Sequence, residues 1–106
     1  MHNDPPIACA LDAFNFEERA RHRALTEEIR ARVEDLRDLP DGYALRLPSD
    51  PSTYLTVAEF VLLERRCCPF FRIGLELEEG QGPLWLRLTG AEGVKEFLRT
   101  RLQPLR

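Results

Sequence analysis

The sequence has no long hydrophobic run and no block of like charge, and each absence excludes a class of protein. No apolar run approaches the roughly 20 residues that a transmembrane helix needs, so we expect no membrane span. The N-terminus has neither a basic region nor a long apolar stretch, which argues against a secretory signal peptide. Arginines alternate with acidic residues and the net charge is −3, so neither nucleic acid nor an anionic membrane is expected as a partner.

Common catalytic motifs are missing, and cysteine is scarce. The sequence contains no glycine-rich phosphate loop, no Ser-His-Asp set and no paired-carboxylate site. Its three cysteines are an odd number and two of them are adjacent, which does not suit a disulfide framework. We therefore expect a protein of the reducing cytoplasm.

The composition of the chain is that of one ordinary globular domain. The chain has 106 residues, of which 43% are hydrophobic and 31% are charged. Residues 1–6 read as a flexible tail and residues 7–106 as a single α+β domain, with no linker between two cores.

Hydrophobic periodicity predicts eight elements in the order β-α-β-β-α-β-β-α. They are a strand over 7–11, a helix over 14–31 that Asp12 caps, a hairpin of 33–39 with 43–48 around Pro40-Asp41-Gly42, a helix over 53–66 that Pro69 stops, a hairpin of 71–78 with 84–89, and a last helix with a capping box at Thr89 and Glu92. The sequence does not decide where the first helix ends, because Val33 and Leu36 would suit either a longer helix or a strand.

This order predicts an antiparallel sheet with helices on one face. It matches a ferredoxin-like split βαβ fold with a C-terminal strand and helix added. In such a sheet the fourth strand lies beside the first. The end of strand 7–11 would then lie next to the start of strand 71–78, and Cys9 would approach Cys67 and Cys68.

The cysteines are the candidate site. Thiolates are nucleophiles and soft-metal ligands, and the adjacent pair Cys67-Cys68 suits a soft ion of low coordination better than a tetrahedral zinc finger. The candidate metal ligands are Cys67, Cys68 and Cys9, with His22 as a fourth. The competing interpretation is that the cysteines pack in the core and that His22, between Arg21 and Arg23, lies on a solvated face.

Three further side chains are candidates for lesser roles. Glu64 lies three and four residues before the two cysteines, on their face of the helix. It is either a general base for a thiol or, more simply, the partner of an arginine. Phe70 and Trp85 are core residues or, if they point outward, a dimerisation patch.

Several segments resemble a family of short, uncharacterised bacterial proteins. The segments are residues 64–71 (Glu-Arg-Arg-Cys-Cys-Pro-Phe-Phe), residues 82–95, Ile7-Ala8-Cys9 and residues 39–43. The Cys-Cys-Pro segment looks like the hallmark of that family. Related segments resemble parts of proteins found alongside mercury- and other metal-responsive regulators, and this implies a soft-metal role.

The leading hypothesis is a small cytosolic binding protein whose cysteine cluster holds Hg(II), As(III), Cu(I) or Zn(II), in metal sensing or resistance. One alternative is a thiol redox or peroxide enzyme using Cys67 or Cys68, which predicts a thiol pKa well below about 8.5. Another is a structural, homodimeric domain with buried cysteines. The expected partners are accordingly a metal ion or small thiophilic ligand and a second copy of the chain.

Overall fold

Two β-hairpins, each followed by a helix, come after a long first helix. A computed structural model describes residues 7–8, 10 and 12–103. The elements are α1 (Phe16–Arg32), β1 (Asp35–Leu39), β2 (Gly42–Leu47), α2 (Pro51–Cys67), β3 (Arg72–Leu77), β4 (Leu84–Thr89) and α3 (Val94–Leu102). All strand pairs are antiparallel, and the strand order in the sheet is β1-β2-β4-β3. The predicted α+β class, the antiparallel sheet and the order of elements from the first helix onward are confirmed.

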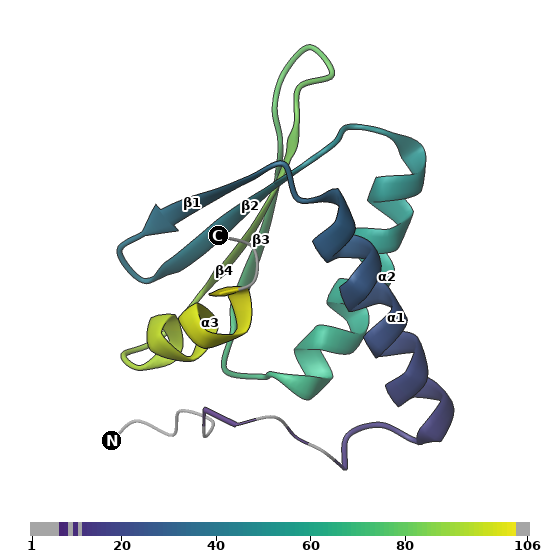
Figure 1. Cartoon of the computed structure of the whole chain (residues 1–106), viewed down its shortest axis with the longest axis vertical. Coiled ribbons are helices and arrows are strands. Elements are labelled where there is room, and N and C mark those ends of the chain that lie inside the picture. The colour runs from purple at the N-terminus through teal and green to yellow at the C-terminus, as the bar shows by residue number, and fades with distance from the viewer. Residues whose placement is uncertain (1–6, 9, 11, 104–106) are drawn as a thin grey trace.

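The three helices cover one face of the sheet. Alternate residues of the central strands β2 and β4 point toward them and form the core with α1, α2 and α3. Helices α1 and α2 lie side by side, and α3 packs beside β2 (Figure 1). No helix in the described part of the chain combines the length and the apolar character needed to cross a bilayer.

The chain before α1 departs from the expected first strand. Ile7, Ala8 and Ala10 belong to no strand, while Cys9 and Leu11 are outside the described residues. The Ala10 amide donates to the Cys67 carbonyl at 2.9 Å, so this segment follows the end of α2 instead of a sheet edge. Within the described residues the sheet consists of the two hairpins, joined by the pairing of β2 with β4.

Two of the predicted helix starts are placed differently. The start of α1 is a capping box in which Asn15 accepts from the Glu18 amide, and Glu18 accepts from the Asn15 amide; Asp12 does not cap it. Thr89 ends β4 instead of capping α3, and α3 begins after Gly93, whose φ of 97° suits glycine. The predicted stop of α2 before Pro69 is confirmed, with Cys68 as its C-cap.

On the helix-free face of the sheet, the side chains of Arg37 and Glu78 cover Trp85. Trp85 lies there and is only 3% exposed, because Arg37 stacks 4.2 Å from its ring centroid and its Nε1 donates to Glu78 at 2.6 Å. Phe70 is also buried, and it meets Phe97 edge to face. An outward patch of Phe70 and Trp85 is therefore excluded.

Candidate metal-binding site

The candidate site lies between α1 and α2. His22 comes from the second turn of α1, and Glu64 and Cys67 come from the last turns of α2. The spacing of three residues places Glu64 and Cys67 on one face of α2. One ligand atom from each of His22, Glu64 and Cys67 lies within 4.8 Å of the other two.

His22 is almost buried, which corrects the solvated-face interpretation. Its side chain is 13% exposed, and its ring lies between Phe14 and Phe60, with centroid distances of 5.2 and 5.8 Å. The physical reason is helical phase: His22 precedes the buried Leu25 and Ile29 by three and seven residues, so it belongs to the buried stripe of α1. The spacing in the sequence carried this signal, and the flanking arginines obscured it.

Glu64 is a buried carboxylate with an incomplete set of partners. The residue is 1% exposed. Its Oε2 lies 3.4 Å from His22 Nε2, which is an ion-pair distance, and its Oε1 lies 3.8 Å from Arg101 Nη1. Within the described residues, neither His22 Nε2 nor Glu64 Oε1 makes a well-formed hydrogen bond. Each buried polar atom left in this way costs about 1–3 kcal/mol, so these two atoms mark a place where a ligand would be stabilised.

The surroundings of Glu64 keep it ionised. Burial by itself raises the pKa of this carboxyl. The neighbouring His22 side chain, the charge of Arg101 and the nearby Cys68 thiol act the other way and outweigh burial, so the pKa lies below its ordinary value. The site therefore presents a carboxylate, which is the form that binds a cation.

Cys68 adjoins the cluster and is held as a thiol. It is fully buried, and Arg101 Nη1 donates to its Sγ at 3.5 Å. Burial raises the pKa of this thiol well above its ordinary value, and the negative charge of Glu64 raises it further, while Arg101 acts in the opposite direction. Neither Cys67 nor Cys68 is in a disulfide.

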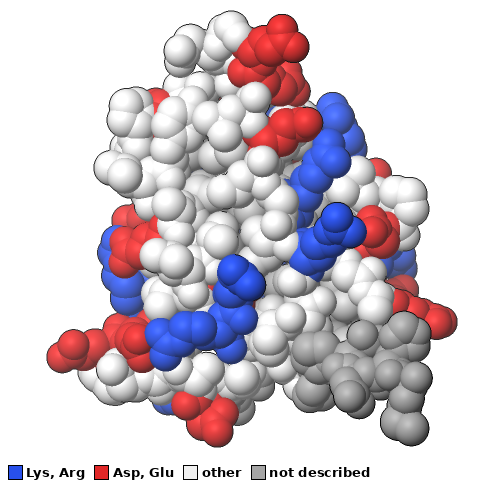
Figure 2. All heavy atoms as spheres, turned by 180° about the vertical axis from the view of Figure 1, so that it is seen from behind, with Lys and Arg blue, Asp and Glu red and all other residues white. Residues whose placement is uncertain are grey.

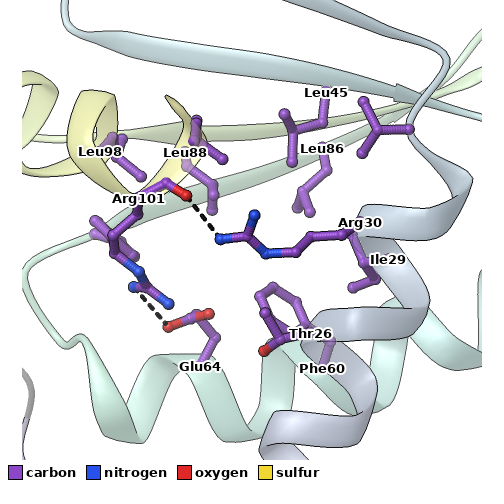
Figure 3. A pocket seen from close by; sticks show the side chains of 13 residues that line it. Thr26, Ile29, Arg30, Leu45, Phe60, Glu64, Leu86, Leu88, Leu98 and Arg101 are labelled. Carbon is purple, nitrogen blue, oxygen red and sulfur yellow. Dashed lines mark hydrogen bonds and ion pairs between the residues drawn. The ribbon is translucent and has the colours of Figure 1, made fainter. Parts of the chain in front are cut away.

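A cavity of about 40 Å³ opens beside Glu64. Figure 3 shows Glu64 and Phe60 of α2 on one side, the leucines of the sheet on the other, and Arg30 and Arg101 reaching in from α1 and α3. Arg30 donates to the Arg101 carbonyl at 2.7 Å, which fixes the end of α3 next to α1. The cavity is lined mainly by apolar side chains, and Glu64, Arg30 and Arg101 are its charged groups.

The structure thus brings together two of the four predicted ligands and adds a third. His22 and Cys67 lie in one cluster, Cys68 is next to it, and Cys9 is outside the described residues. The sequence left Glu64 as a general base for a thiol or, more simply, the partner of an arginine. The structure places it near Arg101, and also beside His22 and Cys67. Arg101 was missed, because nothing in the local pattern of the last helix points to α2.

Comparison of the chain with protein-family models, with curated proteins and with solved structures gives no match. The functional argument therefore depends on the geometry and chemistry of this cluster.

Proposed function

We propose that the protein binds one thiophilic metal ion between α1 and α2. The ligands are His22 Nε2, a carboxylate oxygen of Glu64 and Cys67 Sγ, with Cys68 as an adjacent thiol that joins when the ion is soft. The observation that carries this proposal is the pair of buried, unsatisfied atoms, His22 Nε2 and Glu64 Oε1, in a cluster that includes Cys67. A cation would satisfy both atoms at once.

The donor set suits a borderline or soft ion. Imidazole, carboxylate and thiolate are the ligands of Zn(II), whereas adjacent thiols favour Hg(II), Cu(I) or As(III). Carboxylate and thiolate together supply two negative charges, which neutralise a divalent ion in a buried place. Donor atoms around one tetrahedral zinc are roughly 3.3–3.8 Å apart, so the cluster needs to close by about an ångström, within the reach of side-chain rotation.

The surroundings of Cys68 favour binding over thiol catalysis at that residue. A nucleophilic cysteine needs a lowered pKa and access to substrate. Cys68 has a raised pKa and no exposed surface. A thiophilic ion, by contrast, displaces the thiol proton as it binds. A binding protein of this kind would serve metal sensing or resistance, the role that the resemblance of residues 64–71 implies.

The test is titration of the reduced, full-length protein with Zn(II), Cu(I), Hg(II) and arsenite, followed by native mass spectrometry and a thiol count. We expect one ion per chain and the loss of one or two titratable thiols. His22→Gln, Glu64→Gln and Cys67→Ser should each weaken binding by at least about 10–100-fold. The matched control is Glu59→Gln, because Glu59 is also on α2 but is exposed and pairs with Arg21.

Two outcomes would contradict the proposal. One is a reduced protein that binds none of the four ions at micromolar concentration. The other is binding that the three ligand variants leave unchanged. A Cys9→Ser variant tested in parallel decides whether Cys9 belongs to the ligand set: a further loss of affinity and of one protected thiol assigns it, and unchanged affinity excludes it.

A further inference from the structure

β3 is an edge strand with exposed apolar side chains. Within the described part of the chain it has a strand neighbour, β4, on one side only. Leu75 and Leu77 are 47% and 58% exposed, yet they lie opposite Leu86 and Leu84, which are fully buried on the same face of the sheet. Edge strands are usually protected by lysine, proline or a bulge. β3 contains neither lysine nor proline, and its register with β4 is uninterrupted. Its two charged residues, Arg72 and Glu76, lie on the helix-free face and leave the leucine face without a charge.

The opposite edge strand, β1, is protected, so exposed apolar side chains are not a feature of both edges of this sheet. β1 has only five residues, and Asp35, Arg37 and Asp38 are charged. Its two leucines are partly covered instead of exposed. Seen from behind, the molecule has a broad uncharged region on the side of α2, while basic and acidic side chains are interspersed elsewhere (Figure 2). The two edges therefore differ, and β3 is the one whose apolar side chains are left exposed.

The free backbone groups of β3 can be assigned from the hairpin. The Glu78 amide donates to the Pro83 carbonyl at 3.2 Å, which makes residues 78 and 83 a hydrogen-bonded pair. Hydrogen-bonded and non-bonded pairs alternate along an antiparallel ladder. The amides and carbonyls of Ile73, Leu75 and Leu77 therefore point away from β4, toward the open edge.

β3 is complementary to a second copy of itself. If two β3 strands pair antiparallel about Gly74, Ile73 lies opposite the partner's Leu75, and both residues present their free backbone groups to each other. On the other face, Arg72 lies opposite the partner's Glu76, so two pairs of opposite charge form by symmetry. A register shifted by two residues would pair Arg72 with the partner's Glu78, whose carboxylate accepts from the buried Trp85 at 2.6 Å. Glu76 also has a partner, Arg87 at 3.3 Å, but both of those side chains are about half exposed, so Glu76 is the more available of the two carboxylates.

We propose that two copies of the chain associate through β3, about a twofold axis at Gly74, into one continuous sheet. This interface covers Leu75 and Leu77 and satisfies the backbone groups of both edge strands. The metal-binding cluster lies between α1 and α2 and shares no residue with β3. Either proposal can therefore fail without the other.

The first test is sedimentation equilibrium of the full-length protein and its charge variants. We expect a dimer that Arg72→Glu weakens by about tenfold or more, because like charges then face each other twice. The double variant R72E/E76R should restore dimerisation, since it exchanges the two charges. Loss of the Glu76–Arg87 ion pair is a small cost, because both side chains are about half exposed. Circular dichroism verifies that each variant is folded.

The second test is disulfide crosslinking of variants that also carry Cys9→Ser. Cys67 and Cys68 can stay, because both are buried. Opposed residues of a non-bonded antiparallel pair have Cα atoms about 4.5 Å apart, which a disulfide can bridge. A Cβ at position 74 meets only the Arg87 side chain, at 3.6 Å, so Gly74→Cys is tolerated. We expect Gly74→Cys to crosslink under mild oxidation and the matched variant Glu76→Cys, offset from the axis, to remain uncrosslinked.

Three results would overturn the inference. The first is a monomer at all concentrations examined. The second is a dimer that Arg72→Glu leaves unchanged, which would place the interface elsewhere. The third is efficient crosslinking at Glu76→Cys or Leu75→Cys with none at Gly74→Cys, which would refute this register.

Discussion

Glu64 shows at the level of a single residue how the surroundings decide a charge. Burial favours the neutral acid, while His22, Arg101 and Cys68 favour the carboxylate, and the lowered pKa records which effect is larger. Because the pKa in the folded protein is below the value in the unfolded chain, ionised Glu64 stabilises the fold above the unfolded pKa, about 4.3. That contribution is lost as the pH falls through the folded pKa.

This linkage predicts the behaviour of Glu64→Gln in the metal-free protein. The free energy of unfolding of the wild type should fall more steeply below about pH 4.3 than that of the variant, because only the wild type loses the carboxylate interactions there. Urea denaturation between pH 3 and pH 7 measures both curves. Parallel curves would mean that Glu64 contributes nothing to the pH dependence of stability.

A second prediction for a single residue concerns Cys68. The variant Cys68→Ala distinguishes metal binding by His22, Glu64 and Cys67 alone from binding in which Cys68 also takes part. The thiol is fully buried, so its removal should lower stability by roughly 1 kcal/mol through lost packing. We expect the affinity for Hg(II) or Cu(I) to fall and the affinity for Zn(II), held by the other three ligands, to change little. Equal losses for all ions would show that Cys68 is a ligand throughout.

The elements depend on local signals that can be removed one at a time. In α1 the reciprocal hydrogen bonds of Asn15 and Glu18 satisfy amides at the helix start. Asn15→Ala should cost about 1 kcal/mol of unfolding free energy, whereas Asn15→Asp, which keeps the accepting oxygen, should cost much less. Denaturant unfolding measures both. Equal stability of Asn15→Ala and the wild type would refute a role for this cap.

The pairing of β2 with β4 requires a glycine at position 42. A Cβ there would lie 2.0 Å from the Leu88 carbonyl oxygen, which belongs to the backbone and cannot rotate away. Gly42→Ala should therefore destabilise the protein by about 3 kcal/mol or more. Gly74→Ala is the matched control, since its Cβ would meet only a side chain at an ordinary contact distance. A loss of similar size at both positions would contradict this account.

For the whole molecule, metal binding should appear as thermal stability. An ion that binds only the folded chain adds about 2.7 kcal/mol at 100 times its dissociation constant, which for a domain of this size raises Tm by roughly 10 °C or more. Differential scanning calorimetry with and without Zn(II) measures the shift. Cys67→Ser should abolish the shift, and Glu59→Gln should keep it. No shift at a metal concentration that saturates the wild type would contradict binding to the folded state.

The sequence by itself determined the elements of this protein, because their signals are local. Alternation of apolar residues in 43–48 and 84–89, the turn at Pro40-Asp41-Gly42 and the stop at Pro69 act over a few residues, and each is seen at its expected place. The spacing also placed Glu64 on the face of α2 that carries Cys67. The first strand over 7–11 had the weakest support, because five residues carry little periodicity.

Only the tertiary structure decided which side chains meet. The neighbours of a strand, the burial of His22 and the approach of Arg101 to Glu64 depend on how α1, α2 and α3 pack, and these contacts join residues tens of positions apart. Ion pairs and unsatisfied polar atoms arise from that packing, and the periodicity of the sequence does not predict them. The sequence therefore pointed to Cys67 and His22 as candidate ligands, and the fold brought these two together with Glu64.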